Sequence, residues 1–242
     1  MNALLRGELV KLRTTRTFTA LAATALVLSL LVVCLAGALS SSFTARAVRE
    51  LFTSNFSSEF ILLLGVIGMA GEWRHRTITG TILAAPDRLK LLTAKTLAYA
   101  VAGTVLSAAV TLTDMLVGTV ILSSRGMTTL GIGALADVLW RNLLVGALLG
   151  ALGVCVGGLV RKQLVAIVGL LILAFAVEPT IIALAPRVGR FGPTVAAPSG
   201  IIGGQLSDGD LLAPGYATLV MLAWVAIIFT ASAALLRRRD LL

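Results

Sequence analysis

The sequence has few charged residues, and this scarcity determines its class. Only 13% of its 242 residues are Asp, Glu, Lys or Arg, whereas 58% are hydrophobic. Soluble domains carry about 25% charged and about 45–50% apolar residues, so a water-soluble fold could not cover so much apolar surface. Several apolar runs also reach the roughly 18–20 residues that cross a bilayer. We therefore predict a polytopic membrane protein.

The chain also lacks the residues that most catalytic and metal sites require. His75 is its one histidine, and a zinc site takes three or four ligands. Cys34 and Cys155 both fall in apolar segments, so we expect no disulfide framework. The patterns HExxH, CxxC, GxSxG and the phosphate-binding GxxxxGK[ST] are absent. We expect neither an enzyme activity nor a cofactor on this chain, and any ATP hydrolysis must occur on another polypeptide.

The apolar runs predict an all-α fold with six transmembrane helices in one domain, residues 1–242. The expected spans are residues 18–39, 60–71 with upstream flanking residues, 97–122, 143–160, 164–177 and 216–236. Residues 40–58 are predicted to form a polar loop, and the short periodic piece at 132–140 to lie at the membrane interface. Six spans leave no room for a separate soluble catalytic domain.

Residues 1–16 predict a short amphipathic helix at the bilayer surface. Leu5, Leu9 and Leu12 share one helical face, and basic residues occupy the other faces. The alternative is a mere positively charged flank. The first span has 22 residues, which is long for a signal peptide, so we interpret it as an uncleaved anchor.

The net charge of +9 reflects topology rather than nucleic-acid binding, because the basic residues form short clusters between apolar runs. With both termini inside, 14 of the 20 basic residues lie inside and six lie outside, which follows the positive-inside rule. We therefore expect a multi-pass protein of the cell membrane with both termini cytoplasmic. The six outside are Arg46, Arg49, Arg125, Arg141, Arg187 and Arg190.

A polar stripe runs along the third predicted span. Thr104, Ser107, Thr111 and Asp114 recur at helical spacing, and a carboxylate at the bilayer centre costs at least about 2.5–3.5 kcal/mol. The stripe is interpreted as the lining of a substrate path. Hydrogen bonding between helices explains the same residues equally well.

A second acid, Glu178, lies in the outer part of the fifth span beside Pro179. The proline is expected to break the helix, and residues 178–214 are predicted to form an outer, re-entrant region. The alternative is a helix that simply ends, with Glu178 at the interface. Glu178 joins the stripe residues as a candidate for the substrate path. In the fourth span, Gly146, Gly150, Gly153 and Gly157 predict close helix packing, more plausibly within the chain than across a dimer.

The segment between the second and third spans has a distinctive residue order. It begins with GEWRHRTIT at 71–79, continues with LAAPDR at 83–88 and closes with AK at 94–95. This order, together with ELVKLRTTR at 8–16, resembles the corresponding loop and amphipathic start of ABC-2-type transporter permeases, especially the actinobacterial kind. The resemblance also covers the six-span layout and the broken region before the last span.

The resemblance implies the membrane subunit of an exporter for an amphiphilic or lipophilic substrate. Two such subunits, identical or paralogous, would work with two ABC ATPase subunits that bind ATP and Mg. Residues 72–95 would form a cytoplasmic coupling helix that docks on the ATPase. The expected coupling residues are Glu72, Arg74, Arg76, Thr77, Ile78, Ile82, Leu83 and Arg88.

Three alternatives remain open at this stage. Residues 72–95 could be a solvated loop, although that explains the Arg and Lys residues better than Glu72 or the Thr/Ile pattern. The protein could be an ion- or proton-coupled carrier that uses Asp114 and Glu178, but the internal repeat typical of such carriers is not found. A membrane scaffold without transport would have no need for the polar stripe.

Overall fold

The computed structural model describes residues 2–40, 42–53, 56–74, 87–160, 162–203 and 211–238, and all regular structure in these ranges is helical. Six helical segments are long and apolar enough to cross a membrane. The protein is thus a multi-pass membrane protein with the six spans expected from the sequence. The spans are α2 (Arg16–Leu39), α4 (Ser57–Arg74), α6 (Arg88–Ser124), α7 (Ile132–Leu159), the fifth segment Gln163–Leu184 and α12 (Pro214–Arg238).

Shorter elements complete the fold. The N-terminal helix α1 (Asn2–Thr14) precedes the first span, and α3 (Ala45–Thr53) precedes the second. The fifth segment consists of α8 (Gln163–Ile172), a π-helical stretch at Leu173–Val177 and α9 (Glu178–Leu184). Two short helices, α10 (Pro186–Gly189) and α11 (Ala196–Ile202), connect it to α12.

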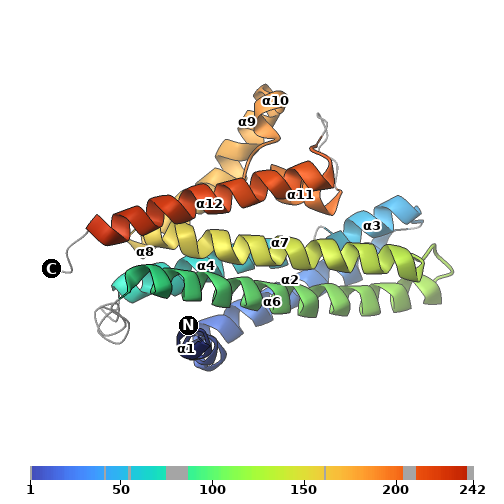
Figure 1. Cartoon of the computed structure of the whole chain (residues 1–242). Helices are drawn as coiled ribbons and strands as arrows, with labels where there is room; N and C mark the ends of the chain where they lie inside the picture. The colour runs from blue at the N-terminus through green and yellow to red at the C-terminus, as the bar shows by residue number, and fades with distance from the viewer. Residues whose placement is uncertain are drawn as a thin grey trace.

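The spans pack around α7, which contacts α4, α6 and α12 (Figure 1). One end of the bundle, at the left of Figure 1, carries α1, the start of α6, the start of α8 and the last turn of α12. We call it the terminal end, and the opposite end with α3 the far end. Helix α1 is viewed almost end-on, so its axis lies across the bundle axis. The fifth segment diverges from α12, and α9 and α10 project beyond the bundle before the chain returns to α11.

Glycines let α7 approach both α4 and α6 closely. A Cβ atom on Gly65 of α4 would lie 2.7 Å from the Gly150 carbonyl oxygen, and one on Gly157 would lie 2.8 Å from the Val66 carbonyl oxygen. Between α6 and α7, a Cβ on Gly146 would lie 2.7 Å from the Gly103 oxygen. The small-residue pattern of the fourth span therefore serves packing within the chain, since only glycine permits such short backbone separations.

Gly150→Ala is expected to lower the free energy of unfolding by about 1–3 kcal/mol, because the added methyl group overlaps the Tyr99 carbonyl and forces α6 and α7 apart. Gly169→Ala in α8 is the matched control, since a Cβ there meets nothing within 4 Å. Thermal unfolding of both variants in the same detergent checks the difference. Equal midpoints for the two variants would contradict the packing argument.

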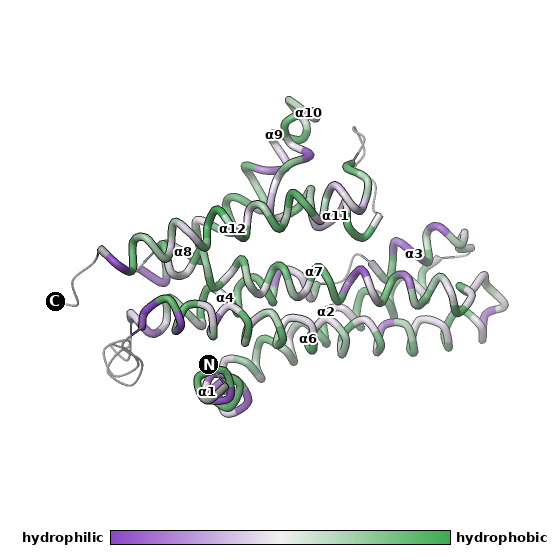
Figure 2. The backbone as a smooth tube through the Cα atoms, viewed as in Figure 1, coloured by the Kyte–Doolittle hydropathy of each residue, from purple (hydrophilic) through white to green (hydrophobic). Residues whose placement is uncertain are grey.

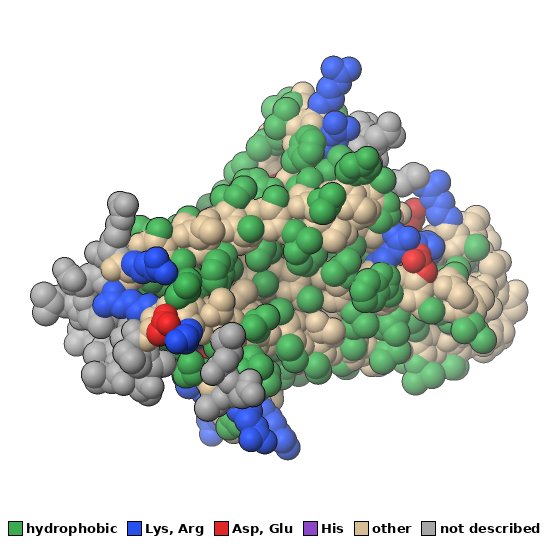
Figure 3. All heavy atoms as spheres, in the orientation of Figure 1, with side chains coloured by type: hydrophobic (Ala, Val, Ile, Leu, Met, Phe, Trp, Pro, Cys, Tyr) green, Lys and Arg blue, Asp and Glu red, His purple; other side chains and the backbone are tan. Residues whose placement is uncertain are grey.

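The surface separates into an apolar middle and charged ends. Figure 2 shows hydrophobic segments along the length of the spans, and Figure 3 shows hydrophobic side chains over the middle with Lys and Arg gathered toward the ends and on α10. Large apolar side chains are exposed on the outer spans, including Leu35, Leu116, Phe175 and Leu219. In water this surface would be unfavourable, whereas in a bilayer it contacts lipid tails.

Three local expectations from the sequence are wrong. Residues 40–58 are not all loop, because α3 forms there and buries Val48 and Phe52. Residues 132–140 are not a separate interfacial piece but the first turns of α7. Pro179 does not break the fifth segment. It lies at the start of α9 directly after the π-helical stretch, where the wider turn relieves the clash that a proline makes with the preceding turn.

Candidate functional site at the terminal end

Four charged side chains meet inside the terminal end and tie three helices together. Lys95 Nζ donates to Glu8 Oε2 at 2.6 Å and to Glu72 Oε1 at 2.9 Å. Lys11 Nζ donates to Glu8 Oε1 at 2.9 Å and to the same Glu72 oxygen at 3.2 Å. We call Glu8, Lys11, Glu72 and Lys95 the ion cluster. It connects α1, the end of α4 and the first turns of α6.

The apolar face of α1 brings Glu8 and Lys11 to this position. Leu12 is buried in a cluster with Leu91 and Leu92 of α6, and Leu5 and Leu9 pack against the same cluster. The leucine stripe therefore packs within the protein, whereas the sequence predicts that it lies on the bilayer surface. Val10 remains 61% exposed on another side of α1. Because α1 lies on α6, Glu8 reaches Lys95.

The ion cluster contains two carboxylates and two ammonium groups. Their mutual attraction sets the direction of the pKa shifts of Glu8 and Lys11. Burial by itself raises the pKa of Glu8, but the charge and hydrogen bond of Lys95, together with Lys11, outweigh burial and lower the pKa. Burial likewise lowers the pKa of Lys11, but Glu8 and Glu72 more than compensate and raise it. Lys95 is 1% exposed and Glu8 is 4% exposed. A buried charge pair of this kind is costly to break, because the remaining partner stays in the interior uncompensated.

Three of the expected coupling residues are described by the structure, and five are not. Arg76, Thr77, Ile78, Ile82 and Leu83 lie outside the described residues. Glu72 is buried in the ion cluster and faces Lys95 and Lys11 rather than solvent. Arg74 is exposed at the end of α4. Arg88 Nη1 donates to the Leu236 carbonyl at 2.6 Å and so ties α6 to the end of α12.

Helix α6 has a well-defined start beside this segment. Asp87 is its N-cap and accepts hydrogen bonds from the backbone N–H groups of Leu89 and Lys90. Those two N–H groups belong to the four at a helix start that have no partner inside the helix. The last turn of α4 and the first turns of α6 are thus both fixed, and residues 75–86 connect two anchored points.

The polar stripe of α6 lies between helices. Ser107 Oγ donates to the Asn142 carbonyl at 2.8 Å, and Asn142 Nδ2 donates at 3.0 Å both to Thr111 Oγ1 and to the Phe52 carbonyl. Ser29 of α2 donates to Asp114 Oδ2. The network links α2, α3, α6 and α7, whereas Thr104 bonds only to the backbone of its own helix among the bonds described.

This geometry supports the interhelical role of the stripe. Ser107, Thr111 and Asp114 are each no more than 1% exposed. Asp114 Oδ1 has no hydrogen-bond partner within the described part of the chain. The substrate-path assignment remains a prediction. Ser29 and Asn142 were not predicted from the sequence, although they could have been noticed as the polar residues that interrupt their own apolar spans.

If the stripe is structural, Asp114 and Ser29 should be energetically coupled. A double-mutant cycle of Ser29→Ala and Asp114→Asn is expected to give about 0.6–1.7 kcal/mol, the mean and maximum measured for interhelical hydrogen bonds in a membrane protein. Thermal unfolding of the four proteins measures it. Transport per folded molecule should stay intact in Asp114→Asn. Lost activity at unchanged stability would favour the substrate-path role.

Glu178 holds the loop that returns from α10. Its Oε1 accepts from the backbone N–H groups of Val195 and Ala196 at 2.8 and 2.7 Å. Its Oε2 accepts from the Thr194 N–H at 2.9 Å and from the Thr194 hydroxyl. Glu178 is 2% exposed, so its carboxylate is buried within the protein. Each carboxylate oxygen accepts two hydrogen bonds. The carboxylate thus satisfies backbone N–H groups of a loop that has no regular secondary structure to pair them.

Comparison with known proteins adds no family assignment. No protein-family model matches the chain, and no curated protein matches its sequence. In the part of the chain that the structure describes, no group of three or more His, Cys, Asp or Glu side chains could hold a metal ion. The assignment of a function therefore depends on the residues of the terminal end.

Proposed function

We propose that this chain is the permease subunit of an ATP-driven exporter of the ABC-2 type, which moves an amphiphilic or lipophilic substrate out of the cell. The observation that carries the proposal is the ion cluster. It joins α1, α4 and α6 at the base of residues 75–86, the segment whose residue order resembles the coupling loop of such permeases.

Residues 75–86 connect helix ends that are anchored to other helices. Glu72 fixes the end of α4 to Lys95, and Arg88 ties α6 to the end of α12. A force applied to residues 75–86 therefore acts on three spans and on α1 together. Such stiff connections transmit the movement of a docked partner to the bundle, while a loosely attached loop would absorb it. Alternating access then requires that the bundle has two alternative packings. The bound partner shifts the equilibrium between them.

The energy source lies on a partner in this proposal. The sequence contains no phosphate-binding loop, so ATP and Mg bind to two ABC ATPase subunits. In this proposal the terminal end is cytoplasmic in the cell membrane, because the sequence segments that are expected inside hold 14 of the 20 basic residues. A second permease copy or a paralogue completes the substrate path.

An ion-coupled carrier is less well supported. A carboxylate that carries a coupling ion must exchange it with water during the transport cycle. Glu178 accepts four hydrogen bonds from one loop, and Asp114 is enclosed between α2 and α6. Their positions favour structural roles for both.

Ile82→Asp tests the docking role without disturbing the ion cluster. The substitution removes an apolar anchor and is expected to weaken binding to the ATPase about 30-fold or more, since interface hot spots contribute about 2–4 kcal/mol. Glu72→Arg is unsuitable, because it would break the ion cluster itself. Co-purification with the ABC ATPase subunits, and substrate-stimulated ATP hydrolysis, measure the effect.

Ile132→Asp is the matched control, because Ile132 is 87% exposed at the far end, away from a partner at the terminal end. It should leave ATPase binding unchanged. Full binding and full coupled hydrolysis in Ile82→Asp would contradict the docking assignment.

A further inference from the structure

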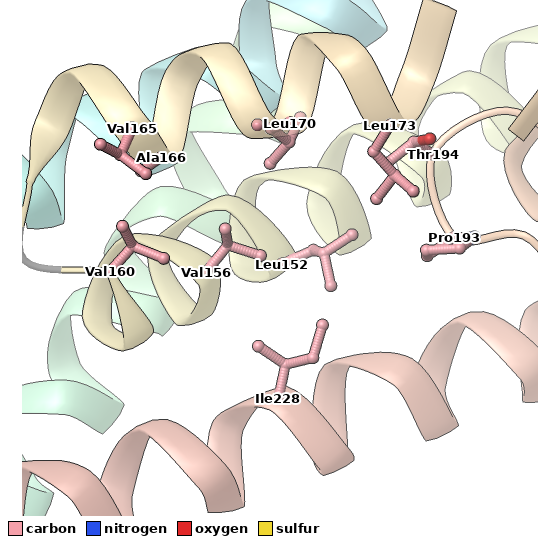
Figure 4. Close-up of a pocket in the computed structure, with 11 residues that line it drawn as sticks. Leu152, Val156, Val160, Val165, Ala166, Leu170, Leu173, Pro193, Thr194 and Ile228 are labelled. Atoms are coloured by element: carbon pink, nitrogen blue, oxygen red, sulfur yellow. The ribbon is translucent and has the colours of Figure 1, made fainter. Parts of the chain in front are cut away.

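An apolar groove lies between α7, α8 and α12 (Figure 4). Its volume is about 160 Å³. The residues that define it include Leu152 and Val156 on α7, Val160 directly after α7, Val165 and Gly169 on α8, and Ile228 on α12. Figure 4 shows the α7 and α8 side chains facing one another across the groove, with Ile228 on the third side.

The lining favours hydrocarbon over water. Thr194 is the one lining residue with a polar side chain, and its hydroxyl donates to Glu178. An apolar cavity of about 150 Å³ stays dry and binds a small hydrocarbon such as benzene, because water would find no hydrogen-bond partners there. The groove is therefore suited to a stretch of acyl chain.

The two ends of the groove differ. Pro193 and Thr194 close the end toward the middle of the bundle, where Glu178 fixes their loop. The other end reaches Val160 and Val165 at the terminal end. Val165 lines the groove and is also 55% exposed, so the groove opens sideways to the bilayer. An acyl chain can thus enter laterally, with its headgroup at the terminal end.

A positive charge marks this open end. Lys162 is exposed and is the N-cap of α8, and its carbonyl accepts a hydrogen bond at 3.0 Å from the N–H of Ala166, which lines the groove. The adjacent Gln163 has a buried side-chain oxygen without a hydrogen-bond partner among the described residues. Basic groups between helices at a membrane surface attract anionic lipid headgroups.

We infer that this groove binds one acyl chain of an anionic phospholipid, with the lipid phosphate paired to Lys162. The lipid belongs to the leaflet at the terminal end. It fills the space that α8 and α12 leave as they diverge, and it packs against α7, the central helix of the bundle. This inference holds whether or not the chain is an exporter.

Trp224 provides a local reporter for the test. It lies one turn before Ile228 on α12, and its Nε1 donates to the Phe191 carbonyl at 2.8 Å. Replacing Trp73 and Trp140 by Phe leaves Trp224 as the only tryptophan. This protein is placed in phosphatidylcholine bilayers that contain a small fraction of brominated phosphatidylglycerol or, separately, brominated phosphatidylcholine. At equal amounts, the brominated anionic lipid should quench Trp224 more strongly.

Two pairs of variants separate the headgroup from the acyl chain. Lys162→Gln should reduce the preference for the anionic lipid about fivefold, which corresponds to the roughly 1 kcal/mol that one basic residue contributes near a membrane surface, and Lys162→Arg should retain it. Gly169→Leu fills the groove, where an added Cβ meets nothing within 4 Å, and should abolish the preferential quenching. Val168→Leu, at a neighbouring position that does not line the groove, should leave it unchanged.

Size-exclusion profiles that match the parent protein establish that each variant is folded. Equal quenching by the two lipids in the parent protein overturns the inference, as does a preference that survives Lys162→Gln or Gly169→Leu. An absence of quenching by either lipid, which a second protein copy seated on the groove would produce, overturns it as well.

Discussion

Lys95→Met is expected to lower the free energy of unfolding by about 3–5 kcal/mol, the range for removing one partner of a buried ion pair. The substitution keeps the length and apolar stem of the side chain but leaves Glu8 and Glu72 buried with Lys11 alone. The two carboxylates then repel each other while both remain largely shielded from water. The thermal unfolding midpoint in detergent measures the loss.

Lys90→Met is the matched control, because Lys90 makes its ion pair with Asp87 at a surface where its side chain is 65% exposed. Exposed pairs contribute about 0–1 kcal/mol, so this variant should stay close to wild type. Adding Glu8→Gln to Lys95→Met should recover part of the lost stability, since one unpaired charge is removed. Similar midpoints for Lys95→Met and Lys90→Met would show that the ion cluster does not hold α1 to the bundle.

Lys95→Met should also reverse the direction in which the contribution of Glu8 to stability depends on pH. In the wild type the pKa of Glu8 is below its ordinary value of 4.5, so the stability that Glu8 contributes is present above that pH and is lost as the pH falls through the lower, folded pKa. Without Lys95, we expect burial to outweigh Lys11 and to raise the Glu8 pKa above its ordinary value of 4.5. The native variant then binds a proton more readily than the unfolded chain, and its deficit should shrink as the pH falls through that raised pKa. A constant deficit would show that Glu8 is not the destabilising charge.

Glu178→Gln is the second substitution with a large expected effect, about 2–6 kcal/mol. The amide has the same shape, but its NH₂ group cannot accept hydrogen bonds. At least two of the donors from Thr194, Val195 and Ala196 therefore lose their partner, at about 1–3 kcal/mol for each buried group. Backbone amide exchange at residues 194–196 should increase together with a lower unfolding midpoint.

Glu50→Gln supplies the control for the same chemical change, because Glu50 pairs with Arg46 on an exposed face of α3. Its midpoint should remain near that of the wild type. If amide exchange at residues 194–196 is equal in Glu178→Gln and Glu50→Gln, the carboxylate does not hold the return loop.

Lys95→Met and Glu178→Gln should affect the proposed transport cycle in different ways. The ion cluster fixes the segment expected to receive force from an ATPase, so Lys95→Met should uncouple hydrolysis from transport even when the partner still binds. Glu178 holds the loop whose Pro193 and Thr194 close the inner end of the groove between α7, α8 and α12. Its loss should loosen the region where the fifth segment leaves the bundle, with no direct effect on ATPase binding.

The amino-acid sequence by itself determined the membrane class and the number of spans. These properties depend on local runs of apolar residues, which a chain of 58% hydrophobic composition displays directly. It also indicated the close packing of the fourth span, because small residues at four-residue spacing have few other uses. Glu178 and Asp114 stood out for a similar reason, since an acid inside an apolar run is rare and needs an explanation.

Only the tertiary structure decided what those acids contact. Glu8 is 87 residues from Lys95, Ser29 is 85 residues from Asp114, and Arg88 is 148 residues from the Leu236 carbonyl. Pairing over such separations depends on which helices become neighbours, and no local spacing encodes that. The π-helical turn before Pro179 was also not predicted, because the sequence rule for proline considers an ideal α-helix alone. The terminal end was thus visible in the sequence as a set of charges, and the packing of α1 onto α6 made it a connected cluster.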